Sequence, residues 1–194
     1  MSLRTILPTT LLACWTVAAV YAIEVPKPDP GQKEHAWLKQ LVGPWEVELE
    51  AKDTEGKVLM QCKQNISYRM LGNLWVVADI EMLDGQNTIL GLQTIGYDPK
   101  AKQYVGTWVD SMHNHLWNYS GSVDEAGKKL TLEATGPNML LPPGAVPQMV
   151  QYRDAYELVS PDEMKVESSM QMPDGKWMVF MSGKAVRKQQ PAAR

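Results

Sequence analysis

From Trp45 onward the sequence alternates apolar and polar residues in short segments, and this period of two is the feature that most constrains the fold. In residues 45–52, Trp, Val, Leu and Ala alternate with Glu and Lys. Such alternation is typical of a strand with one buried face and one wet face. Similar segments continue almost to the C-terminus, mostly separated by short turns rich in Gly, Asp and Asn. The expected strands span 45–52, 58–70, 74–82, 88–97, 103–112, 115–122, 129–135, 148–159, 164–172 and 177–187.

The connections between these segments are too short to hold crossover helices, which excludes a parallel sheet. One short helix is expected before them, over residues 33–42, where Trp37, Leu38 and Leu41 share a face and Gly43-Pro44 ends it. Residues 136–147 are rich in Pro and Gly and should form a loop or lid rather than a central strand. Because closure removes the edges of a wide antiparallel sheet, we predict an all-β, up-and-down antiparallel barrel of about ten strands. A two-sheet sandwich is the alternative.

The first 22 residues have the pattern of a signal peptide. Arg4 precedes a mostly apolar stretch over 6–20, and Val20-Tyr21-Ala22 fits a cleavage site after Ala22. An uncleaved anchor, or lipidation at Cys14, are the alternatives. The apolar stretch is shorter than the roughly 20 residues of a spanning helix, and no later stretch comes close, so the mature chain should have no transmembrane segment. We therefore expect export to the periplasm or the medium.

The remaining chain divides simply. Residues 23–32 hold three prolines and should form an extended linker, residues 33–188 a single β-barrel domain, and residues 189–194 a flexible tail. The chain has 19 basic and 22 acidic residues, a net charge of -3. Because the chain has no basic face, we do not expect nucleic acid as a partner.

A short helix followed by Gly43-Pro44-Trp45 resembles the opening of lipocalin and fatty-acid-binding barrels, the calycin-like folds. In those families the Trp closes one barrel end and a basic residue of the last strand packs on it. The resemblance therefore implies that Trp45 closes the barrel, with Arg187, or alternatively Lys184, on its ring.

A second resemblance covers nearly the whole mature chain. It rests on motifs spaced along its length, which are Glu34-His35-x-Trp37-Leu38, Leu71-Gly72-x-x-Trp75, Gly96-Tyr97-Asp98-Pro99, Tyr104-Val105-Gly106-Thr107-Trp108-x-Asp110-Ser111 and Asp174-Gly175-Lys176. Together they resemble the uncharacterised bacterial domain-of-unknown-function family numbered 1579. The family carries no assigned reaction, so the resemblance implies the domain and a bacterial origin and adds no mechanism.

The densest group of aromatic and polar residues lies in the hairpin over residues 103–122. A two-residue loop pairs Asp110 with Trp117, and a four-residue loop pairs Asp110 with His115, but either places the same residues on one face. That set is Trp108, Asp110, Met112, His115, Trp117 and Tyr119. We assign this face to the lumen, because on the outer surface of the barrel these side chains would form a large exposed apolar patch. The set suits a small, largely apolar ligand with one polar group.

The same residues offer two kinds of chemistry as alternatives to simple binding. Asp110 can orient His115 as a general base, with Ser111 or Tyr119 as a hydroxyl, but regular alternation puts Ser111 on the opposite face. His113-x-His115 with Asp110 can bind zinc, but His35 is the only further His and zinc needs three or four ligands. Haem on His115 or His35 is a weaker alternative. We expect no metal and no cofactor.

These observations favour an exported, non-catalytic barrel that binds a small apolar or amphipathic molecule. The alternatives are a hydrolase or isomerase that uses an Asp110–His115 pair, and an interaction module whose lumen is filled by its own side chains. An open lumen would favour the binding barrel, and a lumen filled by side chains would favour the interaction module.

Overall fold

The computed structural model describes residues 27–188, except 54, 86, 142, 143 and 147. The expected signal peptide, its cleavage site at Ala22, the start of the linker at 23–26 and the tail over 189–194 lie outside the described residues. Residues 27–32 contain neither helix nor strand. Among the described residues, no helix combines the length and apolar character needed to cross a membrane.

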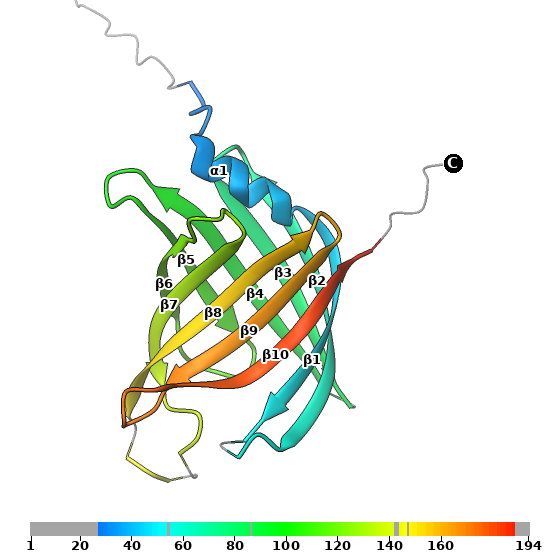
Figure 1. The fold of residues 1–194 in the computed structure, drawn as a ribbon, viewed down its shortest axis with the longest axis vertical. Helices are drawn as coiled ribbons and strands as arrows, with labels where there is room; N and C mark the ends of the chain where they lie inside the picture. The colour runs from blue at the N-terminus through cyan, green and yellow to red at the C-terminus, as the bar shows by residue number, and fades with distance from the viewer. Residues whose placement is uncertain (1–26, 54, 86, 142–143, 147, 189–194) are drawn as a thin grey trace, which may run out of the picture.

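Ten strands form one closed antiparallel barrel, in which each strand pairs with its neighbours in sequence and β1 pairs with β10 (Figure 1). The strands are β1 (Gly43–Lys52), β2 (Val58–Leu71), β3 (Trp75–Asp84), β4 (Asn87–Asp98), β5 (Gln103–Asp110), β6 (Trp117–Val123), β7 (Lys129–Pro137), β8 (Met149–Ser160), β9 (Glu163–Gln171) and β10 (Trp177–Arg187). A short helix, α1 (Lys33–Leu38), and a 3-10 turn, η1 (Lys39–Leu41), precede them. The predicted up-and-down barrel with one short N-terminal helix is confirmed, and the sandwich alternative is wrong.

The alternation in β1 shows how the sequence sets the register. Trp45, Val47 and Leu49 are buried in the lumen, while Glu48 is exposed on the outer wall. A slip of one residue would expose all three apolar side chains, and each contributes about 1.5–3 kcal/mol by its burial. Hydrophobic burial therefore fixes which face of the strand points inward.

α1 and η1 lie across one end of the barrel, the closed end (Figure 1). Leu38 and Leu41 are fully buried there. The Trp37 indole N–H donates to the carbonyl of Gly127 in the β6–β7 turn over 2.8 Å. The Tyr104 hydroxyl of β5 donates to the carbonyl of Glu34 over 3.0 Å. These contacts hold the helix against the strand ends.

The junction of β1 and β10 lies at the same end. Trp45 is 0% exposed and its indole N–H donates to the carbonyl of Leu41 over 2.7 Å. The Arg187 guanidinium carbon lies 4.2 Å from the centre of the Trp45 ring. A Cβ on Gly43 would lie 2.7 Å from an Arg187 nitrogen, so a side chain there would displace the guanidinium. Lys184, the alternative to Arg187, instead forms an ion pair with Glu163 at 2.8 Å.

The opposite end, the open end, carries the connections β5–β6 over residues 111–116 and β7–β8 over residues 138–148 (Figure 1). The prediction that the loop starts at Gly136 is wrong, because β7 continues through Pro137, which pairs with Met149. Pro137 is tolerated because it is the last residue of its strand, where its missing N–H removes little of the ladder. Its carbonyl accepts a hydrogen bond from the Tyr152 hydroxyl at 2.5 Å.

Candidate functional site

A cavity of about 200 Å³ lies in the barrel lumen. Its lining includes Met112 and His113 from the β5–β6 connection and Met139 from the β7–β8 connection, so it reaches the open end. Most of its wall is apolar or aromatic. The aromatic and methionine side chains that line it are Tyr68, Met82, Trp108, Met112, Trp117, Tyr119, Met139, Tyr152, Tyr156, Phe180 and Met181. A wall of this kind fits a compact, largely apolar molecule.

A carboxylate lies inside the lumen among hydroxyl groups. Asp154 of β8 lines the cavity and accepts a hydrogen bond from the Ser168 hydroxyl of β9 at 2.5 Å. It also accepts one from the Tyr119 hydroxyl of β6. Behind them, the Gln93 amide of β4 donates to the Tyr156 hydroxyl over 2.7 Å. We call these five residues the inner cluster.

The inner cluster contains an acceptor that the described residues leave unused. Gln93 is 1% exposed, and its Oε1 is buried without a hydrogen-bond partner. Burial raises the pKa of Asp154, although the hydrogen bonds from Ser168 and Tyr119 oppose this shift. Burial, and then the charge of Asp154, raise the pKa of Tyr119 and Tyr156 well above the ordinary value. The tyrosines therefore stay neutral, and Asp154 is the one group of this cluster that can carry a charge at neutral pH.

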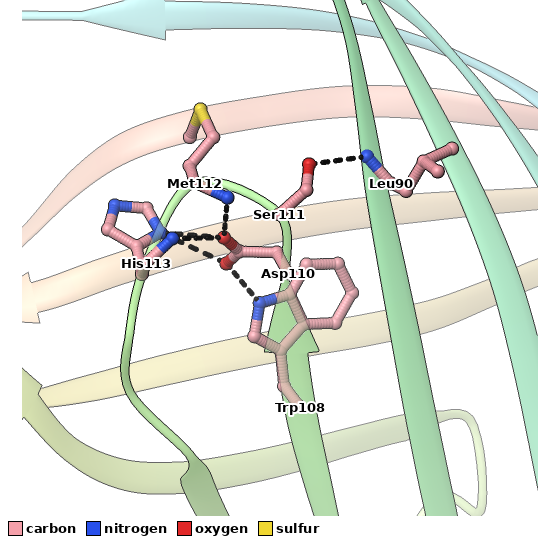
Figure 2. A network of polar contacts seen from close by, with 6 residues as sticks. All are labelled: Leu90, Trp108, Asp110, Ser111, Met112 and His113. Carbon is pink, nitrogen blue, oxygen red and sulfur yellow. Dashed lines mark hydrogen bonds and ion pairs between the residues drawn. The ribbon is translucent and has the colours of Figure 1, made fainter.

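A second polar group, the mouth cluster, surrounds Asp110 at the end of β5 (Figure 2). Its carboxylate accepts the Trp108 indole N–H at 2.9 Å and the backbone N–H groups of Met112 at 2.8 Å and His113 at 2.9 Å. The His113 Nδ1 lies 2.9 Å and 3.0 Å from the two carboxylate oxygens. Both oxygens are thus occupied by groups of the same hairpin. The Asp110 side chain is 5% exposed.

The mouth cluster stabilises the ionised carboxylate. Burial alone raises the pKa of Asp110, but the hydrogen bonds from His113, Trp108 and the Met112 N–H outweigh it, so the pKa is lowered. The Trp108 ring lies over Gly91 of β4, where an added Cβ would come within 2.6 Å of the ring. A glycine opposite Asp110 therefore leaves the space that the indole occupies.

Five of the six residues assigned to one face line the cavity, namely Trp108, Asp110, Met112, Trp117 and Tyr119. The observed register pairs Trp108 with Trp117, which corresponds to the four-residue loop. His115 is not among the lining residues. Its Nε2 lies 3.2 Å from the carbonyl of Thr135, and its ring packs edge-on against Trp117.

The structure therefore does not bring Asp110 and His115 together, because the chain turns at 111–113 and places His113 on the carboxylate instead. Ser111 is held elsewhere, since its hydroxyl accepts the Leu90 N–H at 3.0 Å (Figure 2). His35 is buried at the closed end, where its Nδ1 accepts the Gln32 N–H at 2.8 Å. Over the described part of the chain, no three His, Cys, Asp or Glu side chains are placed to share a metal ion.

Of the inner cluster, the sequence predicts only Tyr119 as a lumen residue, and Asp154, Ser168, Gln93 and Tyr156 were not predicted. The sequence feature that could have revealed this cluster is an Asp on the apolar face of a strand. Along β8 the inward-facing positions are Tyr152, Asp154, Tyr156 and Leu158. A carboxylate at such a position is costly unless it has partners. Ser168 pairs with Asp154 in the β8–β9 hairpin, beyond a register shift between Leu158 and Ser160, whereas Tyr119 comes from β6, which does not pair with β8.

Comparison with known families identifies the chain. It matches the family described as "Protein of unknown function (DUF1579)" over residues 30–187, and it therefore belongs to that family. No curated protein matches it.

Two solved structures share the fold. Rv2717c from M. tuberculosis has a TM-score of 0.56 and 13% identity, with 83% of this chain and 100% of that chain covered. The S-type phycobiliprotein lyase CPES from Guillardia theta has a TM-score of 0.53 and 11% identity, with 81% and 94% covered. At these identities the similarity shows the barrel fold alone.

Proposed function

We propose that this member of the DUF1579 family is a binding protein that holds a small apolar or amphipathic molecule in its barrel lumen. The observation that carries the proposal is the cavity of about 200 Å³, which reaches the open end and has aromatic walls and an internal carboxylate. Trp108, Trp117 and Tyr152 supply large apolar surfaces, and Asp154 supplies a polar anchor. This combination fixes both the shape and the orientation of a bound molecule.

The open space in the lumen supports binding over a self-filled interaction module. Larger side chains at small or branched lumen positions such as Val166 would fill the cavity of about 200 Å³ and bury more apolar surface. A barrel that needed only a core gains nothing from leaving the space open.

The mouth cluster argues against Asp110 as a general base. A general base needs a free lone pair within reach of the substrate. Both oxygens of Asp110 accept hydrogen bonds from its own hairpin, and the lowered pKa of its carboxyl makes it a weak base. His113 is held by the same carboxylate. The hydrogen bonds of the cluster thus fix the conformation of the β5–β6 connection beside the cavity.

Export is part of the proposal. The positive, apolar and Val-x-Ala order of residues 1–22 predicts a mature N-terminus at Ile23 in the periplasm or the medium. N-terminal sequencing of the exported protein tests this directly. A chain that begins at Met1 or at Cys14 would contradict it.

Lumen binding is tested with a small neutral probe, 1-naphthalenemethanol, by isothermal titration calorimetry. Val166 lines the cavity, whereas Val186, on the neighbouring strand, is exposed on the outer wall. We expect Val166→Phe to weaken binding at least about tenfold, because the added ring fills the lumen, and Val186→Phe to leave it unchanged. Equal effects of the two variants, or no binding by the wild type, would contradict lumen binding. Native mass spectrometry of protein purified from its own host then identifies the class of the natural ligand.

A further inference from the structure

Asp154 is a half-buried carboxyl group in the lumen without a positive partner. Its hydrogen bonds come from two neutral hydroxyls, those of Ser168 and Tyr119. No ion pair to Asp154 exists among the described residues. A carboxylate removed from water normally has a cation or a metal as its partner, because neutral donors replace only part of its hydration.

The rest of the cavity supplies no such cation. Its lining, as far as the structure describes it, contains no Lys or Arg. The only basic side chain in it is His113, which is already held by Asp110 at the mouth. Three carboxyl groups, those of Asp154, Asp110 and Glu167, therefore line one small, mostly apolar space that offers no Lys or Arg side chain where the structure describes it. A ligand with a carboxylate or phosphate group would be repelled there.

The carboxylate still has acceptor capacity that faces the cavity. An ionised carboxylate offers about four lone-pair sites, and the two hydroxyls use two of them. The remaining sites suit an N–H donor. Around it stand the rings of Tyr68, Tyr119 and Tyr156, and aromatic faces attract cations as well. Gln93 adds a further buried acceptor, its unpartnered Oε1, behind Tyr156.

We propose that the lumen selects a small apolar molecule that carries a cationic nitrogen, and that this nitrogen binds Asp154 while the apolar part contacts Trp108 and Trp117. The inference rests on the proposed binding function and names the ligand class for the same cavity. A neutral molecule with a hydroxyl donor would fill the same space but would leave the charge of Asp154 uncompensated. An anion of the same shape would bind worst.

The test uses three probes that share one ring system, which are 1-naphthylmethylammonium, 1-naphthalenemethanol and 1-naphthoate. Their affinities for the wild type are measured by isothermal titration calorimetry at neutral pH. We expect the ammonium probe to bind at least about tenfold more tightly than the alcohol, and the naphthoate most weakly, because a charge-assisted hydrogen bond in a low dielectric is stronger than a neutral one. This comparison requires no variant.

Asp154→Asn keeps the shape of the side chain and removes its charge. Glu157→Gln is the matched control, because Glu157 lies on the same strand outside the cavity lining, in an exposed ion pair with Lys165. The preference for the ammonium probe should disappear in D154N and persist in E157Q. Persistence in D154N, or equal loss in E157Q, would place the charge recognition away from Asp154 and overturn the inference. Wild-type NMR locates the probe independently, with nuclear Overhauser contacts expected from its CH₂N protons to the Tyr119 ring rather than to Met112.

The failures of the two proposals are distinguishable. If the ammonium and the alcohol bind the wild type equally well, the inference about the cation is wrong and lumen binding stands. If none of the three probes binds, lumen binding itself is overturned, and the inference fails with it.

Discussion

Arg187→Met is expected to destabilise the barrel because it removes the guanidinium from the closed end while keeping an apolar stem. The guanidinium donates to the carbonyl of Val42, to that of Gln40 at 2.8 Å and to that of Pro161 at 2.9 Å. A hydrogen bond from a charged donor contributes about 1.5–3 kcal/mol when shielded from water, and the exposed bonds contribute less. The contact with the Trp45 ring adds about 0.5–2 kcal/mol. We expect a total loss of about 3 kcal/mol.

The assay is urea unfolding, supported by thermal unfolding, in which about 3 kcal/mol lowers the melting temperature by roughly 6–12 °C for a domain of this size. Lys184→Met is the matched control. It removes a cation from the same strand, but its ion pair with Glu163 is exposed to solvent, so its loss should cost less than about 1 kcal/mol. If the two variants lose equal stability, Arg187 does not hold the closed end and the reasoning fails.

Three further predictions concern the lumen. Gly91→Val should displace the Trp108 ring and shift the intrinsic tryptophan fluorescence, because an added Cβ lies 2.6 Å from that ring; an unchanged emission maximum would contradict this placement. Burial raises the folded-state pKa of Asp154, so the folded wild type binds more protons than the unfolded chain in a pH window that starts near 3.8 and extends upward. The stability of the wild type should therefore fall as the pH rises through this window. Urea unfolding of D154N should lack that fall. For Asp110 the pH dependence of stability has the opposite sign, because its folded-state pKa is lowered and the ionised carboxylate stabilises the fold at neutral pH. This contribution should be lost as the pH falls below 3.8 through the folded-state pKa. The stabilities of D110N and the wild type should therefore converge in acid.

The strands and their closure could be predicted from sequence because both depend on local patterns. Alternation in segments such as residues 45–52 sets the inward face, and short turns make neighbours antiparallel. Trp108 and Trp117 could be placed on the same face of the sheet without knowing the loop length between their strands. Loops of two or four residues change which residues pair, but not which residues share a face.

The partners of the carboxylates could not be predicted in the same way. The partner of Asp110 depends on the irregular backbone of residues 111–116, where period-two reasoning no longer applies, so His113 rather than His115 reaches it. One partner of Asp154, Ser168, lies opposite it in the β8–β9 hairpin, but a register shift between Leu158 and Ser160 displaces the pairing from that of a regular hairpin. The other, Tyr119, is 35 residues away on β6, and this contact follows from the curvature of the barrel, which no single segment encodes.

The pairing of β1 with β10 also has a consequence for how the chain folds. Every other ladder joins strands that follow one another in sequence and can form as soon as each hairpin is made. The seam between β1 and β10, in contrast, joins Trp45 to Arg187 across almost the whole domain. Its loop-closure entropy is the largest in the molecule, so seam formation should be the slow, late step of folding. Until that step the sheet has two unpaired edges, and a nascent chain that stops short of residue 177 exposes both of them to aggregation.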